Sequence, residues 1–349
     1  MTDSQEIAFK GITRAVFARV SMVAKGRYEW TDVLPEKWIT PQDDPGTEEG
    51  GPWLKERDPE WTPPEFEVRV SPTRDRENPG LHRLFARVPP TKTGVRAFAK
   101  KWGQLGRRAG LRFKPGQGYA ESLAYWQREI DAMARLVGLW ELVRTGDHQG
   151  LAPFVRWTTL PEQWGTRPRQ LSIYLALKDG QLDPQGAEEV AEKVELICPT
   201  DREQPDLTHQ LEPYRASAEI LACEHEEHPY RAELFADWPE GDLLGPARYY
   251  LHAAVNGYLA GHVNPIVPLP DTQAKVDFWF VPDTLLANLY VLFAMELSGQ
   301  LLAPKECKAE DCRRVFIPAS TKQEYCTSMC RVRADAHRRR ARLMKRLPP

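Results

Sequence analysis

The sequence predicts a mixed α+β fold with a mainly helical body, a few strands and a small cysteine-rich module at its C-terminal end. Apolar residues recur at helical spacing along much of the chain, and short strand-like runs interrupt them. Four of the six cysteines fall within the last 43 residues. The 349 residues are 42% hydrophobic and 28% charged, which is typical of a globular protein and excludes wholesale disorder.

Residues 1–90 are expected to form a separate N-terminal segment. Four aliphatic residues at helical spacing predict a helix at its start: Ile12, Val16, Val20 and Val23. Eleven of residues 31–90 are proline, which restricts the backbone, so we expect an extended wrap over the core with one strand at 65–70. The tryptophans of this stretch indicate burial; a base-stacking strip is the alternative, which the acidic composition disfavours.

Residues 91–304 are expected to form the body. Apolar spacing and helix-stop residues predict helices at 93–105, 119–144, 186–197, 246–261 and 283–297. Strand-like runs lie at 154–159, 170–178 and 275–281. The last helix is apolar on nearly every side, so we expect it at the centre of the core.

The net charge of −2 hides a division between an acidic body and a basic C-terminal end. Residues 305–349 contain thirteen lysines and arginines against five acidic residues, whereas the other 304 residues contain 34 basic and 44 acidic residues. This asymmetry indicates an anionic partner, and folding back onto the acidic body is the alternative.

The sequence also bears on the cellular compartment. It has no run of about 18 apolar residues, so we expect no membrane-spanning helix and no membrane partner. The N-terminus does not show a basic patch followed by an apolar block, so we expect no secretory signal and a cytoplasmic protein.

The cysteines at the C-terminal end have the spacing of a metal site. Cys307 and Cys312 form one close pair, Cys326 and Cys330 form a second, and thirteen residues separate the pairs. This pattern predicts a structural site in which four thiolates hold Zn²⁺ in a tetrahedron, with Phe316 and Tyr325 as an apolar lid. A catalytic zinc is disfavoured because four cysteines leave no position for water. Four thiols in a small core are the alternative.

A strongly basic helix is predicted after the last cysteine. Its cations are expected to bind nucleic acid: Arg331, Arg333, Arg338, Arg339, Arg340, Arg342, Lys345 and Arg346. Guanidinium groups match phosphate in both charge and geometry. Val332, Ala336, Leu343 and Leu347 form a thin apolar stripe that would dock one edge of the helix. An acidic protein surface is the competing partner.

The segment CKAEDCRRVFIPASTKQEYCTSMCRVRADAHRRRAR resembles the CGNR-type zinc fingers at the C-termini of many bacterial proteins. The matching positions are Cys307, Cys312, Phe316, Tyr325, Cys326, Cys330 and Arg333. Arg331 and Val332 stand where that motif has glycine and asparagine. The resemblance implies a treble-clef-like finger that binds DNA. Four upstream blocks (FAKKWGQLG, ESLAYWQREI, ARYYLHAAVNGYLAGHVNP and PDTLLANLYVLFAMEL) resemble uncharacterised bacterial proteins with a similar finger.

Together these features predict a zinc-dependent nucleic-acid-binding protein, DNA-binding rather than RNA-binding, with a regulatory and non-enzymatic role. The three predicted parts are residues 1–90, 91–304 and 305–349. The body would sense a signal, dimerise or bind a protein partner. No glycine-rich phosphate loop, nucleophile elbow or HExxH motif occurs in the sequence.

Two other functions stay open. One is a nuclease or toxin-like effector that the finger targets, for which Arg248 and His252, one helical turn apart, are candidates; a packed core histidine is the simpler interpretation. The other is an interaction subunit of a larger assembly, such as a defence complex, with a purely structural finger. Cys223, His225 and His228 form a further candidate metal cluster, and a solvated acidic loop is the simpler interpretation.

Overall fold

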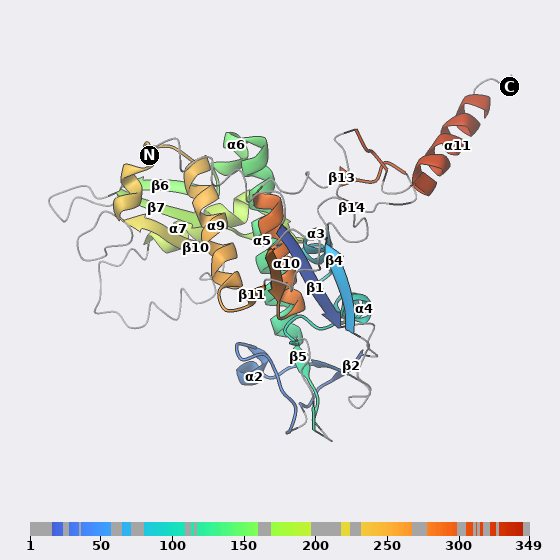
Figure 1. Cartoon of the computed structure of the whole chain (residues 1–349). Helices are drawn as coiled ribbons and strands as arrows, with labels where there is room; N and C mark the ends of the chain where they lie inside the picture. Colours follow the sequence, from blue (N-terminus) through green and yellow to red (C-terminus); the bar gives the residue numbers. More distant parts are fainter. Residues whose placement is uncertain are drawn as a thin grey trace. The chain divides into compact units, whose positions relative to one another are not determined.

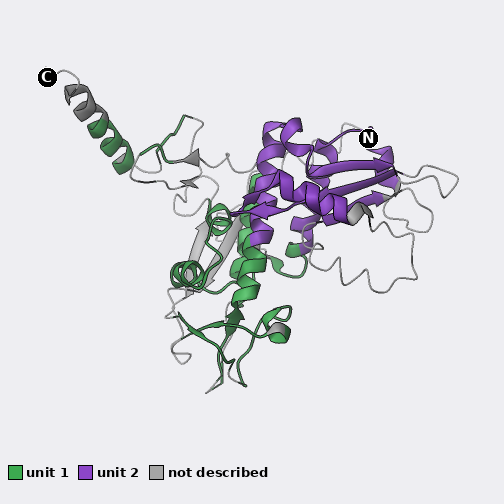
Figure 2. Ribbon diagram, turned by 180° about the vertical axis from the view of Figure 1, so that it is seen from behind, with its two compact units in different colours: residues 1–130, 258–349 green, residues 131–257 purple. Residues whose placement is uncertain are grey.

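The computed structural model has a mixed α+β fold, which confirms the predicted class. The structure describes residues 16–23, 28–34, 36–56, 65–70, 80–108, 113–114, 117–159, 169–196, 218–223, 232–266, 278–298, 305–309, 312, 315–316, 322–325 and 328–344. The chain divides into two compact units, residues 1–130 with 258–349 and residues 131–257 (Figure 2). The domain boundaries expected at residues 90 and 304 stay predictions.

The first unit contains a four-stranded sheet with the order β11-β12-β1-β4. Its strands are β1 (Val16–Val23), β4 (Glu65–Val70), β11 (Val263–Ile266) and β12 (Phe278–Pro282). β1 runs parallel to β12 and antiparallel to β4. The strand predicted at 65–70 is therefore confirmed, and β12 lies at the end of the strand predicted at 275–281.

The helix predicted from the N-terminal valines is wrong, because Val16, Val20 and Val23 lie in β1. A spacing of four is an even number, so Val16 and Val20 fit one face of a strand as well as one face of a helix. Partners on both sides of β1, together with the strand preference of β-branched valine, favour the strand. Ile12 lies outside the described residues.

A second, three-stranded sheet of this unit is built from short elements, as the prolines predict. It has the order β2-β3-β5, with β2 at Tyr28–Thr31, β3 at Trp53–Glu56 and β5 at Ala120–Ser122. The four-residue helix α2 (Gly46–Glu49) lies between β2 and β3 in the chain. β5 occupies the predicted start of the helix at 119–144, because Ala120 to Ser122 pair with β3.

Four helices complete the first unit: α3 (Leu81–Phe85), α4 (Lys92–Trp102), α5 (Leu123–Thr145) and α10 (Leu285–Leu297). α5 begins in this unit and continues into the second. Thr91 caps α4 by accepting a hydrogen bond from the Gly94 amide, and Gly103, at φ 98°, follows its last residue. α10 is buried along most of its length, as predicted, and contacts α3 and β1 (Figure 1).

A buried ionic cluster joins α3 to α10. Arg83 donates to both carboxylate oxygens of Glu296, and His82 Nε2 lies 2.8 Å from Glu296 Oε2. Burial lowers the pKa of His82, so the neutral ring donates from Nε2 to the carboxylate. Burial alone would raise the pKa of Glu296, but the hydrogen bonds from His82 and Arg83 lower it to about 2. Glu296 is therefore ionised in the interior.

A second buried acidic side chain, that of Glu121, anchors the loop after α4. It accepts hydrogen bonds from the amides of Leu105, at 3.1 Å, and Gly106, at 2.6 Å. Burial raises the pKa of Glu121 to about 8 against the opposing effect of these amides. Arg107, in the same loop, forms a buried ion pair with Glu56 of β3. The loop is thus held against the three-stranded sheet by polar groups.

The second unit is centred on an antiparallel sheet with the order β10-β7-β6. Its elements are β6 (Val155–Thr159), β7 (Arg169–Tyr174), β8 (Leu177–Lys178), β9 (Gln181–Leu182), β10 (Ala218–Cys223), α6 (His148–Leu151), α7 (Pro184–Leu196), η2 (Ala232–Ala236) and α9 (Leu244–Leu259). Those predicted at 154–159, 186–197 and 246–261 are confirmed. The strand predicted at 170–178 is divided into β7 and β8.

The C-terminal module of the first unit consists of β13 (Lys305–Glu306), β14 (Val315–Phe316) and α11 (Ser328–Met344). β13 and β14 pair antiparallel. The treble-clef-like finger that the resemblance implies stays a prediction. Among the described helices of the whole chain, none combines the length and the apolar character needed to cross a bilayer.

Candidate metal centre

Three of the four predicted zinc ligands lie together in the C-terminal module. The sulfur atoms of Cys307, Cys312 and Cys330 all lie within 4.8 Å of one another. Cys307 and Cys330 are buried, and Cys312 is half-buried. Cys326, the fourth predicted ligand, lies outside the described residues. The three cysteines are positioned to hold a metal ion.

The local structure explains how these thiols come together. Cys307 directly follows β13, and Cys312 lies in the connection to β14, which pairs with β13. The Cys312 amide donates to the Ala309 carbonyl oxygen at 2.9 Å, which folds this connection into a tight turn. Cys330 is the third residue of α11, so the turn and the first turn of the helix meet at the cluster.

Two contacts join the cysteine turn to the segment that leads into α11. The Lys308 amide donates to the Glu324 carbonyl oxygen at 3.0 Å, and the Lys308 ammonium lies 2.6 Å from the Glu324 carboxylate. The ammonium is exposed, so the ion pair adds little stability, whereas the backbone hydrogen bond sets the register between the two segments. This connection was not apparent in the sequence.

Two further residues, Ala309 and Tyr325, pack with the cysteines. Ala309 is only 2% exposed and, with Cys307 and Cys330, forms a small core against which Cys312 and Tyr325 pack. The lid predicted for Tyr325 is therefore confirmed. Phe316 pairs with Lys305 in the hairpin, but its side chain lies outside the described residues. Ala309 was missed in the sequence, although a small residue between two ligands of a tight turn is a usable signal.

The chemistry of the cluster suits a metal that prefers sulfur. A tetrahedral zinc site has Zn–S bonds of about 2.3 Å, which place its sulfur atoms about 4 Å apart. The observed separations, all within 4.8 Å, agree with such a geometry. Cys330 also lies in the first turn of α11, where unpaired backbone amides favour the thiolate form. Three thiolates leave one position of a tetrahedron for a further ligand, and Cys326 is the predicted one.

The predicted nucleic-acid-binding cations are distributed along and beyond α11. Arg331 and Arg333 are exposed immediately after the last cysteine. Four others lie on the helix with side chains outside the described residues: Arg338, Arg339, Arg340 and Arg342. Lys345 and Arg346 lie wholly outside them. Val332 is 66% exposed, so its part of the predicted apolar stripe is not docked against the described residues.

Among the described residues, the other candidates form no comparable cluster. Arg248 and His252 are both exposed on α9, so the interpretation of His252 as a packed core histidine is wrong. Cys223 ends β10, whereas His225 and His228 lie outside the described residues.

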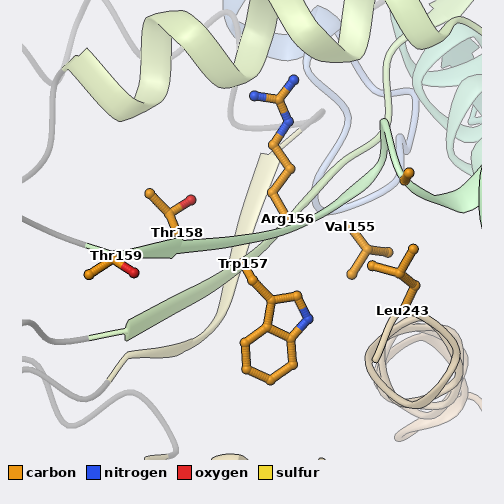
Figure 3. A pocket seen from close by; sticks show the side chains of 7 residues that line it. Val155, Arg156, Trp157, Thr158, Thr159 and Leu243 are labelled. Carbon is orange, nitrogen blue, oxygen red and sulfur yellow. The ribbon is translucent and has the colours of Figure 1, made fainter. Parts of the chain in front are cut away.

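A shallow, open pocket runs along β6 in the second unit (Figure 3). Its lining residues are Ala152, Val155, Arg156, Trp157, Thr158, Thr159 and Leu243. Arg156 and Trp157 point to opposite sides of the strand, and the Trp157 ring donates to the Asp242 carbonyl oxygen at 2.8 Å. The lining contains no cysteine, histidine or carboxylate, so the pocket offers no acid–base or metal-ligating group.

No known protein family matches this chain, and no curated protein or solved structure shows significant similarity to it. The class of the protein therefore rests on its own structure. It is a mixed α+β protein with a C-terminal cysteine cluster that is positioned to hold a metal ion.

Proposed function

We propose that this protein binds nucleic acid, and duplex DNA in preference to RNA, through a zinc-anchored α11. Zinc would be held by Cys307, Cys312, Cys326 and Cys330, and the arginines that follow would contact phosphate groups. The zinc would be structural rather than catalytic, because four cysteine ligands leave no coordination position for a reacting water. The role proposed for the protein is regulatory.

This proposal rests on one observation: at the start of α11, a candidate metal ligand is followed directly by exposed arginines. Cys330 is buried in the cysteine cluster, whereas Arg331 and Arg333 are exposed next to it. A bound ion would fix the first turn of the helix relative to the hairpin, and thereby fix where these guanidinium groups stand. Such preorganisation lowers the entropic cost of binding a polyanion.

The charge of the module supports the same partner. Residues 305–349 carry thirteen basic against five acidic residues, and eight of the basic residues follow Cys330. Guanidinium groups fit phosphate oxygens with two parallel hydrogen bonds, which an ammonium group does not provide. The preference for DNA follows from the resemblance to DNA-binding fingers.

The experiment is a salt titration of binding to a fluorescein-labelled 20-base-pair DNA duplex, followed by fluorescence anisotropy. We expect R331Q/R333Q to weaken binding and to make the slope of log K against log salt shallower by about 2, since each phosphate contact contributes about 0.9. A matched control, K37Q/K178Q, removes two exposed lysines from elsewhere and should bind as the wild type does.

Two further arms complete the test. Removing the metal with a chelator should weaken binding at least as much as R331Q/R333Q, and an RNA duplex of the same sequence should bind less tightly. Wild-type protein that binds neither duplex at 50 mM salt would contradict the proposal. Equal binding by R331Q/R333Q and the control would show that α11 is not the contact surface.

A further inference from the structure

Residues 1–304 contain a basic stretch that their net charge conceals. Residues 78–120 include ten lysines and arginines and no aspartate or glutamate. Because residues 1–304 as a whole have 34 basic and 44 acidic residues, the remainder of residues 1–304 has 24 basic against 44 acidic residues. This region of the first unit therefore has the opposite charge to its surroundings in the sequence.

Only two of these cations, among the described residues, are buried in ion pairs within the protein. Arg83 and Arg107 are buried and form ion pairs with Glu296 and Glu56. The described members that are exposed are Arg87, Lys92, Arg96, Lys100, Lys101, Arg108 and Lys114. Arg108 is paired with Asp283 at 3.3 Å. Four of the exposed residues lie on one helix, α4.

Three cations on α4 form a row, which we call the α4 basic row: Lys92, Arg96 and Lys100. Their spacing of four residues places successive side chains about 6 Å apart along the helix axis. The opposite face of α4, formed by Val95, Phe98, Ala99 and Trp102, is buried in the core. The core thus fixes the orientation of the helix, and the basic row faces solvent.

The row is weakly neutralised by the protein itself. No hydrogen bond or ion pair involves the side chain of Arg96 or Lys100 within the described part of the chain. Lys92 lies 3.7 Å from Asp32, whose side chain is 89% exposed, so this pair is well screened by water. Exposed cations at regular spacing, with only a screened acidic neighbour at Lys92 among the described residues, attract an extended anion.

We propose that the α4 basic row is a second contact surface for the phosphate backbone of nucleic acid, separate from α11. This inference rests on the proposed function in that both surfaces would bind the same polymer. A duplex carries one negative charge for about every 1.7 Å of its axis, so one molecule can neutralise two separate basic surfaces. The proposed contacts are made to phosphate groups, and phosphate contacts position a protein on the duplex without reading its sequence.

The structure favours nucleic acid over an anionic membrane. A helix that binds a membrane surface exposes apolar side chains beside its cations and inserts them between the lipids. The large apolar side chains exposed in the described residues are Val33, Ile39, Met329 and Val332, and none of them lies on α4. The apolar face of α4 is committed to the core, so the row offers charge alone.

The test uses the full-length protein and the variant R96Q/K100Q. Glutamine has nearly the helix propensity of the residues it replaces, so α4 should stay folded, which circular dichroism and the melting temperature will check. The control is again K37Q/K178Q. We expect R96Q/K100Q to make the salt slope for the DNA duplex shallower by about 2. Wild type should then lose about 12-fold more affinity than the variant between 50 and 200 mM salt.

The outcomes separate this inference from the proposed function. If R96Q/K100Q binds as the control does while R331Q/R333Q is weakened, the α4 row is overturned and the role of α11 stands. If only R96Q/K100Q is weakened, the row stands and α11 is overturned. Binding to phosphatidylserine vesicles that depends on Arg96 and Lys100, without a change in duplex binding, would assign the row to a membrane and overturn the inference.

Discussion

The sulfur atoms of Cys307 and Cys330 lie within 4.8 Å of each other, although the two residues are 23 positions apart in the chain. Cys312 lies within the same distance of both. A metal ion at this point would close the loop between the hairpin and α11, and its binding energy would contribute directly to folding of the module.

The first prediction concerns metal content. We expect freshly purified protein to contain about one zinc per chain, and C330S to contain much less, because a hydroxyl is a poor zinc ligand compared with a thiolate. Mass spectrometry of the metals measures this directly. C223S is the matched control, since Cys223 ends β10 in the other unit, and it should retain the metal. Metal loss in both variants would argue against the cluster.

The second prediction concerns the ion pair between Arg83 and Glu296. E296Q leaves the Arg83 guanidinium buried without its counter-charge, so we expect a loss of about 3–5 kcal/mol in the free energy of unfolding. Urea unfolding at pH 7 measures it. E188Q, at an exposed position on α7, should change stability by less than about 0.5 kcal/mol. Similar values for the two variants would contradict the role of this pair.

Glu296 also predicts a dependence of stability on acid. Its pKa is about 2 in the folded protein against an ordinary value of 4.5, so the folded state binds this proton less tightly than the unfolded state. The stability that it contributes is complete above pH 4.5 and is lost as the pH falls from about 4.5 to 2. The free energy of unfolding of E296Q should therefore change less with pH across this window than that of the wild type. Parallel curves for the two proteins would refute the lowered pKa of Glu296.

Glu121 predicts the opposite slope at higher pH. Because its pKa is raised from 4.5 to about 8, the folded state keeps a proton that the unfolded state releases. Its contribution is complete below pH 4.5 and is lost as the pH rises through 8. We expect the melting temperature of the wild type to fall more between pH 6 and pH 9 than that of E121Q. An equal fall in both proteins would count against this assignment.

The core position of α10 gives a further prediction. Phe293 is fully buried, so F293A should lower the free energy of unfolding by about 3–5 kcal/mol through lost burial and the cavity left behind. V332A removes an exposed side chain of α11 and serves as the control, with an expected change below about 0.5 kcal/mol. Chemical denaturation compares the two. A small effect of F293A would mean that α10 is peripheral.

Much of the fold could be predicted where local patterns had one interpretation. α10 was recognisable because its apolar residues surround the helix, and the end of α4 was recognisable from Gly103. β1 was not recognisable, because the spacing of Val16 and Val20 fits both the period of a helix and that of a strand. Only pairing with the distant strands β4 and β12 favours the strand. β5 was missed for the same reason, because its partner β3 lies far upstream in the chain.

The candidate metal site also has features that a local sequence pattern predicts and features that depend on contacts between distant residues. Ligand spacing identified Cys307, Cys312 and Cys330 without any tertiary information. The connection between Lys308 and Glu324 depends on how the chain returns to the cysteine turn, which no local pattern encodes. The α4 basic row was hidden because the charge of the body was averaged over 304 residues, a window far wider than the stretch that carries it.

The most direct test of the account is X-ray absorption at the zinc edge of the purified full-length protein. Zinc held by Cys307, Cys312, Cys326 and Cys330 should show four sulfur neighbours at about 2.3 Å. A first shell of nitrogen or oxygen atoms at about 2.0–2.1 Å, or the absence of zinc from freshly prepared protein, would contradict a sulfur-held anchor for α11.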